Sequence, residues 1–460
     1  MRTDWSNYTM QTLLESKIAQ DLPPLPTQYW GQITRLSAQM VTIDGLAALA
    51  SIGDIVEMRG VNDRSVYGEI ITLTPKEAIA TAFGEVSGLT TGSRVFYHGQ
   101  TDPRPDISWI GKVLDHSGRM QDGSLPEQGL TPAPLKAKPP STMRKAIGNR
   151  LNTGIAAIDT FLPLCQGQRT GLFAGSGVGK SSLLATLAKG TNADIAILAL
   201  VGERGREVRG FTEETLGVEG MKKSIVIVAT SDEPPALKLR AAYLAMATAE
   251  YFRDQGLQVL LLFDSLTRFA EAHRSVALSA GETPSLRAFP PSTFQALAGL
   301  CERAGPGVAG KGDITAVFSV LVAGSNMEEP VADMVRGILD GHVVLDRTIA
   351  ERGRYPAIDI RRSVSRALPD CASDEENQYL SRGRKLIGAY EDARSLIQAG
   401  LYQSGSDLLL DEAVLKYASL DNFISLTKQG TAETSFLTLA DILHDGEIDE
   451  DSEIDLEISP

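Results

Sequence analysis

A glycine-rich turn that ends in Lys180 and Ser181 carries the residue types that point most directly to chemistry. It follows a short apolar run at 170–174 and leads into the helical pattern SSLLATLAKG. Glycines let successive backbone N–H groups turn toward anionic oxygens, and the start of the following helix adds partial positive charge. In this motif the lysine is a point charge for the β- and γ-phosphates of ATP, and the serine hydroxyl is a ligand for Mg²⁺. The residues predicted to hold the phosphates are Gly175, Ser176, Gly177, Val178, Gly179, Lys180, Ser181 and Ser182.

One position departs from the usual G-x-x-x-x-G-K-[ST] spacing, because Ala174 stands where the first glycine is expected. Alanine is compatible with that position if its φ angle is negative. We therefore interpret the turn as a variant of the motif.

Two carboxylates follow apolar runs of strand length. Asp264 ends the run VLLLF, and an acid at the carboxyl end of a parallel strand lies at the crevice where nucleotides bind. We predict that Asp264 holds Mg²⁺ directly or through water. Glu203 ends the preceding run and is expected to orient and deprotonate the attacking water, with Arg204 at the γ-phosphate. The alternative for Glu203 and Arg204 is a charged loop that caps the sheet.

The pattern of the elements around these residues indicates three folded parts. Short β-type runs punctuated by glycine turns, at 27–96, predict a small antiparallel barrel. Apolar runs alternate with helical patterns between 150 and 369, which predicts a parallel α/β sheet. The expected domains are a partner-binding segment at 1–26 (or a frayed terminus), the barrel at 27–96, an ATPase domain at 97–378, a helical domain at 379–440, and an acidic disordered tail at 441–460.

Composition bounds the class of protein. Three cysteines among 460 residues are too few for a disulfide framework, and no apolar run reaches the length of a membrane span, so a cytoplasmic location is expected. The net charge is -14, and the tail from Asp445 to Glu457 holds eight carboxylates and no base. The predicted barrel has slightly more acids than bases and no interleaving of aromatic with basic residues. We therefore expect no nucleic-acid partner.

Several segments together resemble the RecA-type ATPases of the rotary synthase and type III secretion group. They are GERGRE after the second strand, LLLFDSLTRFA around Asp264, DGHVVLDR at 340–347 and ERGRYPAID at 351–359. Within that group the chain is most similar to the type III export ATPases, flagellar or injectisome. The resemblance implies an α/β fold with a RecA-like P-loop ATPase core, an N-terminal β-barrel and a C-terminal helical domain.

The resemblance also implies roles for individual residues. Lys180 and Ser181 bind phosphate and metal, Glu203 positions water, and Asp264 is the acid on the metal side. Tyr355 would stack on adenine, and Arg366 resembles the arginine finger that reaches a neighbour's γ-phosphate. Because one chain holds both Glu203 and Arg366, a ring of identical subunits would suffice, and the resemblance implies a homohexamer.

The expected function is Mg-ATP hydrolysis that energises type III protein export, flagellar by preference, with chaperone release and substrate unfolding. The partners implied are a regulator protein at the N-terminus, a central stalk protein facing the loop at 322–330, export chaperones and substrates, and an export gate at the inner membrane, with which the cytoplasmic ring is peripherally associated. The alternatives are an injectisome ATPase, a catalytic subunit of a rotary ATP synthase, an RNA-translocating ring ATPase, and a non-catalytic scaffold, against which Glu203 argues.

Overall fold

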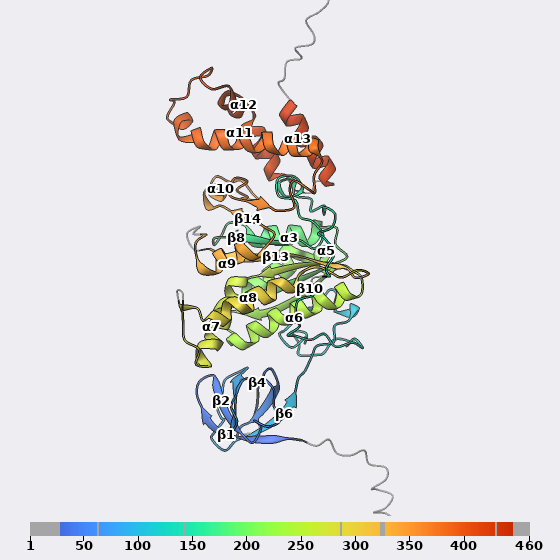
Figure 1. The fold of residues 1–460 in the computed structure, drawn as a ribbon, viewed down its shortest axis with the longest axis vertical. Helices are drawn as coiled ribbons and strands as arrows, with labels where there is room; N and C mark the ends of the chain where they lie inside the picture. Colours follow the sequence, from blue (N-terminus) through green and yellow to red (C-terminus); the bar gives the residue numbers. More distant parts are fainter. Residues whose placement is uncertain are drawn as a thin grey trace, which may run out of the picture. The chain divides into compact units, whose positions relative to one another are not determined.

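The structure is a computed structural model, and it describes residues 28–61, 64–140, 143–285, 288–322, 327–427 and 430–444. The chain divides into two compact units, one up to Thr101 and the other from Asp102 (Figure 1). The expected partner-binding segment at 1–26 lies outside the described residues, as do most of the acidic tail and part of the loop expected to face a stalk. Over the described ranges, the model contains no helix with the length and apolar character of a bilayer span.

Six strands of the first unit close into an antiparallel barrel in the order β1-β2-β5-β4-β3-β6, with β1 also paired to β6. Alternate side chains, among them Ile33, Ile43, Met58 and Val95, fill its interior because successive residues of a strand face opposite sides. The predicted barrel is confirmed, and its last strand extends beyond the expected boundary at 96. The strands are β1 (Trp30–Leu36), β2 (Met40–Asp44), β3 (Ile55–Arg59), β4 (Ser65–Leu73), β5 (Glu77–Ala82) and β6 (Arg94–Gly99).

The barrel brings basic and aromatic side chains together across neighbouring strands. The Arg94 guanidinium lies 5.4 Å from the centre of the Trp30 ring, and the Arg59 guanidinium lies 4.4 Å from that of Phe96. The members of each pair are far apart in the sequence. Strand pairing therefore brings aromatic and basic side chains together, although they do not alternate along the chain.

The second unit is built on a mainly parallel sheet of nine strands in the described residues. The order along the sheet is β15-β14-β8-β13-β11-β9-β10-β7, with β12 paired to β13. Its principal strands are β8 (Arg169–Ala174), β9 (Ile195–Glu203), β10 (Ser224–Thr230), β11 (Gln258–Asp264), β13 (Asp313–Leu321) and β14 (Gly341–Leu345); the short ones are β7 (Val113–Leu114), β12 (Gly305–Pro306) and β15 (Val364–Ser365).

Helices cover both faces of this sheet, because its strands are apolar on both sides. In β9, Leu198 and Leu200 belong to one core and Ile197, Ala199 and Val201 to the other. The first core also contains side chains of α2, α3 and the C-terminal helices; the second contains side chains of α6, α7, α8 and α9. The helices are α2 (Ala156–Asp159), α3 (Lys180–Gly190), α4 (Gly205–Gly210), α5 (Gly217–Met221), α6 (Pro235–Asp254), α7 (Leu266–Ser279), α8 (Pro291–Arg303), α9 (Pro330–Ile338) and α10 (Arg347–Glu351), with a 3₁₀ turn η1 (Ile107–Trp109) and a π-helical turn η2 (Phe211–Leu216).

In the described part of the chain, three helices follow the sheet: α11 (Asp374–Gln398), α12 (Leu408–Ser425) and α13 (Ala432–His444). A capping box at the start of α11 satisfies two backbone N–H groups, because each of Ser373 and Glu376 donates its N–H to the side chain of the other. The helical region thus begins before the expected boundary at 379. It also includes residues 441–444, which were expected to belong to the tail.

Candidate active site

The phosphate-binding turn connects the end of β8 to the start of α3. Gly177 and Gly179 have φ angles of 77° and 87°, a left-handed conformation that costs glycine little and other residues more. Ala174 ends the strand and does not have a positive φ, as its place in the motif requires. Ser176, Ser181 and Ser182 are exposed, so their hydroxyl groups are accessible. The turn therefore has the backbone shape that a phosphate cradle needs.

The strand order brings Lys180 to both predicted carboxylates. Its Nζ lies 2.5 Å from Oδ1 of Asp264 and 3.4 Å from Oε1 of Glu203. The neighbouring strands β9 and β11 end at the same edge of the sheet, which places the two acids side by side. Asp264 is almost fully buried, with 4% of its side chain exposed, whereas Glu203 retains 20%. This is one charged cluster, with a cation between two acids.

A β-bulge at Gly202 sets the direction of Glu203. Val201 pairs with Ala229, whereas Thr230 pairs with Glu203, so Gly202 is an extra residue with a φ of 79°. Without the bulge, strict alternation would place Glu203 on the same face as Val201, which packs toward α6. The extra residue turns Glu203 to the other face, where Lys180 and Asp264 lie.

Two further residues support this cluster and were not assigned a role from the sequence. The hydroxyl of Ser319, on β13, donates a 2.6 Å hydrogen bond to Oδ1 of Asp264. Arg268 packs under Gly202, since a Cβ added to that glycine would lie 2.9 Å from Cβ of Arg268. The hydrogen bond to Glu271 is the main cause that raises the pKa of Arg268, and the negative charges of Glu203 and Asp264 add to the rise. Ser319 interrupts the apolar end of β13, AVFSVL, and a polar residue on a buried strand was the available signal.

Burial raises the pKa of Glu203 above its ordinary value of 4.5, the negative charge of Asp264 adds to the rise, and the nearby Lys180 opposes it. A general base must be deprotonated, so its activity is lost as pH falls through the raised pKa.

We therefore expect the acid limb of kcat/KM for ATP hydrolysis to lie above pH 4.5. The measurement is the pH profile of kcat/KM, with nucleotide affinity and circular dichroism followed at each pH to separate protonation from loss of binding or folding. An acid limb at or below the ordinary value, with folding and affinity intact, would contradict this assignment.

Tyr355 lies against the last glycine of the phosphate-binding turn. A Cβ added to Gly179 would be 3.2 Å from Cδ1 of the Tyr355 ring, although the two residues are far apart in sequence. The residue is about half exposed, at 51%. Part of the aromatic side chain is thus accessible beside the turn, and an aromatic ring suits a flat ligand.

The two remaining predicted arginines are exposed. Arg204 is 72% exposed, and its ion pair in the described residues is with Glu207 at 3.5 Å. Arg366 follows β15 at the edge of the sheet; its backbone N–H donates to the Asp340 carbonyl at 3.0 Å and its side chain is exposed. The structure of one chain therefore does not bring Arg204 or Arg366 to Lys180.

The oxygen atoms near Lys180 suit magnesium only in part. Asp264 offers a carboxylate and Ser181 an exposed hydroxyl, which are the ligand types Mg²⁺ prefers. Among the described residues no group of three or more His, Cys, Asp or Glu side chains is arranged to hold a metal ion. Mg²⁺ commonly binds through one or two protein oxygens with waters and phosphates completing the shell, so the residues fit a metal that arrives with a nucleotide.

Together, the fold and the site define a P-loop nucleotide-binding protein of the ATP synthase type. The nucleotide-binding domain of the ATP synthase alpha/beta family matches residues 154–365, and the beta-barrel domain of that family matches 33–97. Residues 372–440 match the T3SS EscN ATPase C-terminal domain.

Relatives of the whole chain agree. A protein named "Flagellum-specific ATP synthase" from Caulobacter vibrioides is 40% identical over 429 residues, covering 91% of this chain and 96% of the relative. The "Type 3 secretion system ATPase" of Xanthomonas euvesicatoria is 39% identical, with 90% and 93% covered. The structure of the assembled ATPase EscN from the enteropathogenic E. coli type III secretion system has a TM-score of 0.81 to this chain at 36% sequence identity. The match covers 90% of this chain and 100% of that one.

The chain belongs to the type III export ATPase family, which is related to the ATP synthase α/β subunits. The predicted family, fold class and type of enzyme, an ATP hydrolase, are confirmed.

Proposed function

We propose that this protein hydrolyses Mg-ATP at the boundaries between identical subunits of a hexameric ring and so energises type III protein export, flagellar by preference. The observation that carries the proposal is the contact of Lys180 with Asp264 and Glu203, combined with the place of the exposed Arg366. Its backbone is bonded to Asp340 beside the start of β8, at the opposite end of that strand from the phosphate-binding turn. Such a chain has the parts of a hydrolytic site but requires a neighbour to complete it.

Each residue has a role in this proposal. The amides of the turn and Lys180 hold the phosphates, while Ser181 and Asp264 would hold Mg²⁺, which supplies charge neutralisation at the β- and γ-oxygens. Glu203 accepts a proton from the water that it orients toward the γ-phosphate. Arg204, which is exposed in the single chain next to Glu203, would contact that phosphate once it is bound. Arg366 of the adjoining subunit would stabilise the charge that develops on it, because a guanidinium stays charged and spreads its donors over several oxygens.

Tyr355 is proposed to stack on adenine. Substitution by alanine should raise KM for ATP by about 3–10-fold, since aromatic stacking contributes roughly 0.5–1.5 kcal/mol. Tyr355→Phe keeps the ring and should retain the wild-type KM. Steady-state ATP hydrolysis measures both variants, and equal KM values for alanine and phenylalanine would argue against stacking.

The solved complex of assembled EscN with its central stalk EscO, 37% identical to this chain with a TM-score of 0.79, supports a ring and a stalk as partners. Further proposed partners are a regulator at the N-terminal segment, export chaperones and substrates, and an export gate at the inner membrane, where the cytoplasmic ring would associate peripherally. No nucleic acid is proposed as a partner.

The test is hydrolysis by the purified chain alone as a function of its concentration. Specific activity should rise as the ring assembles, whereas a rotary synthase catalytic subunit would need a separate finger-donating chain. Stimulation by RNA would favour the translocating alternative. In the source organism, deletion should abolish flagellar assembly. Loss of effector secretion with normal motility would assign the protein to an injectisome.

A further inference from the structure

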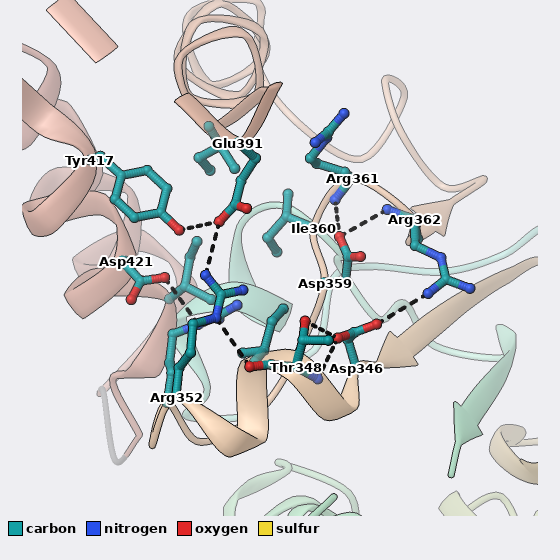
Figure 2. Close-up of a pocket in the computed structure, with 14 residues that line it drawn as sticks. Asp346, Thr348, Arg352, Asp359, Ile360, Arg361, Arg362, Glu391, Tyr417 and Asp421 are labelled. Atoms are coloured by element: carbon teal, nitrogen blue, oxygen red, sulfur yellow. Dashed lines mark hydrogen bonds and ion pairs between the residues drawn. The ribbon is translucent and has the colours of Figure 1, made fainter. Parts of the chain in front are cut away.

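The turn that carries Tyr355 is attached to the C-terminal helices by the arginines that precede the tyrosine. Arg352 lies 3.4 Å from Glu391 on α11, and Arg354 lies 3.0 Å from Asp421 on α12. Figure 2 shows Arg352, Glu391 and Asp421 around a pocket of about 140 Å³ between these elements. The Tyr417 hydroxyl donates to the same Glu391 carboxylate, which fixes that acid in turn.

Arg354 is the more buried of the two arginines. Only 12% of its side chain is exposed, against 36% for Arg352. Burial lowers the pKa of Arg354, and the negative charge of Asp421 opposes that shift. A desolvated guanidinium depends strongly on its partner, because its lost hydration must be replaced by fixed contacts.

Arg354 also closes the turn in which Tyr355 sits. Its NH2 group donates a 2.8 Å hydrogen bond to the backbone carbonyl of Ile358, across Tyr355, Pro356 and Ala357. The guanidinium therefore joins the two ends of this turn to each other and to Asp421 on α12. The tyrosine ring itself is half exposed, so the backbone turn contributes much of what holds it beside Gly179.

We propose that Arg354, held by Asp421, is a positioning residue for the adenine side of the nucleotide site. It fixes the Tyr355 turn so that the ring face is in place before the base arrives, and it makes α12 a structural part of base recognition. Pre-organisation of this kind improves binding by reducing the ordering that binding must impose. The inference rests on the proposed stacking of Tyr355.

The test compares Arg354→Met, Asp421→Asn, Tyr355→Ala and the double variant Arg354→Met/Tyr355→Ala in the full chain. Each of the first two should raise KM for ATP by about 3–10-fold while kcat stays within about twofold, because only the base contact is disturbed. Inorganic tripolyphosphate, which has no base, should inhibit these variants as it inhibits the wild type. In the Tyr355→Ala background, Arg354→Met should have no further effect on KM.

Arg361→Ala is the matched control. Arg361 lines the same pocket and pairs with the exposed Asp392 of α11 at 2.6 Å, but it lies outside the Tyr355 turn and its loss should leave KM unchanged. The inference would be overturned if Arg354→Met raised KM by the same factor in the wild-type and Tyr355→Ala backgrounds. It would also be overturned if tripolyphosphate inhibited the Arg354→Met or Asp421→Asn variant more weakly than the wild type. If Tyr355→Ala raises KM but Arg354→Met and Asp421→Asn leave it unchanged, the positioning role is wrong and the stacking role of Tyr355 is retained. An unchanged KM in Tyr355→Ala would overturn both. Should Arg354→Met fail to fold, Asp421→Asn carries the same test.

Discussion

Replacing Arg366 with alanine should lower kcat for ATP hydrolysis by about 10³–10⁵-fold, the range for a lost arginine finger. Binding of a fluorescent nucleotide should change little, since the phosphate turn and Tyr355 remain intact. The physical reason is that Arg366 is exposed at the edge of the sheet, away from the Lys180 cluster of its own chain, and would meet a γ-phosphate only in a neighbour's site. Arg347→Ala removes another exposed arginine, paired with Glu351, and should keep full activity.

Mixing two defective chains tests the shared site directly. Rings that combine Arg366→Ala subunits with Lys180→Ala subunits should regain activity, because some boundaries then join an intact Lys180 to an intact Arg366. Neither variant alone should hydrolyse ATP appreciably. Mixed rings that assemble and yet show no recovery would argue that Arg366 does not act across a boundary.

Substitution of Glu203 by alanine should slow hydrolysis by about 10²–10⁴-fold while ATP affinity stays nearly intact, as expected when a general base is lost. Single-turnover hydrolysis and nucleotide binding measure the two quantities separately. The geometry behind this expectation is the carboxylate at 3.4 Å from Lys180, turned to that face by the bulge at Gly202.

Glu213→Gln is a suitable control, since Glu213 is exposed and paired with Arg209 on the surface. It should hydrolyse ATP at the wild-type rate. Unaltered turnover in Glu203→Ala would remove Glu203 from the mechanism and leave the role of base unassigned.

Much of the fold followed from local pattern. Glycine turns between short β-type runs predicted the barrel, and apolar runs alternating with helical patterns predicted the parallel sheet; both are confirmed. The sequence also assigned Asp264 and Glu203 to the ends of two strands. Neighbouring parallel strands end at the same edge of a sheet, so the two acids lie close together because β9 and β11 are adjacent. The structure places them on either side of Lys180.

Contacts between distant segments could not be obtained in this way. The Ser319 bond to Asp264 depends on β13 lying beside β11, and the arginine–aromatic pairs of the barrel depend on strand register. The link from Arg354 to Asp421 depends on how α12 packs against the sheet domain. No short window of sequence contains both members of any of these pairs.

The residues that can carry the chemistry are recognisable from the amino-acid sequence alone, because a phosphate turn is local: glycines, a lysine and a helix start lie in one short stretch. Which side chains face one another depends on the assembled fold. The extra residue at Gly202 turns Glu203 toward Lys180, and packing of α12 fixes the turn that holds Tyr355. Side-chain direction depends on strand pairing and on long-range packing, and both are set only when the whole core is assembled.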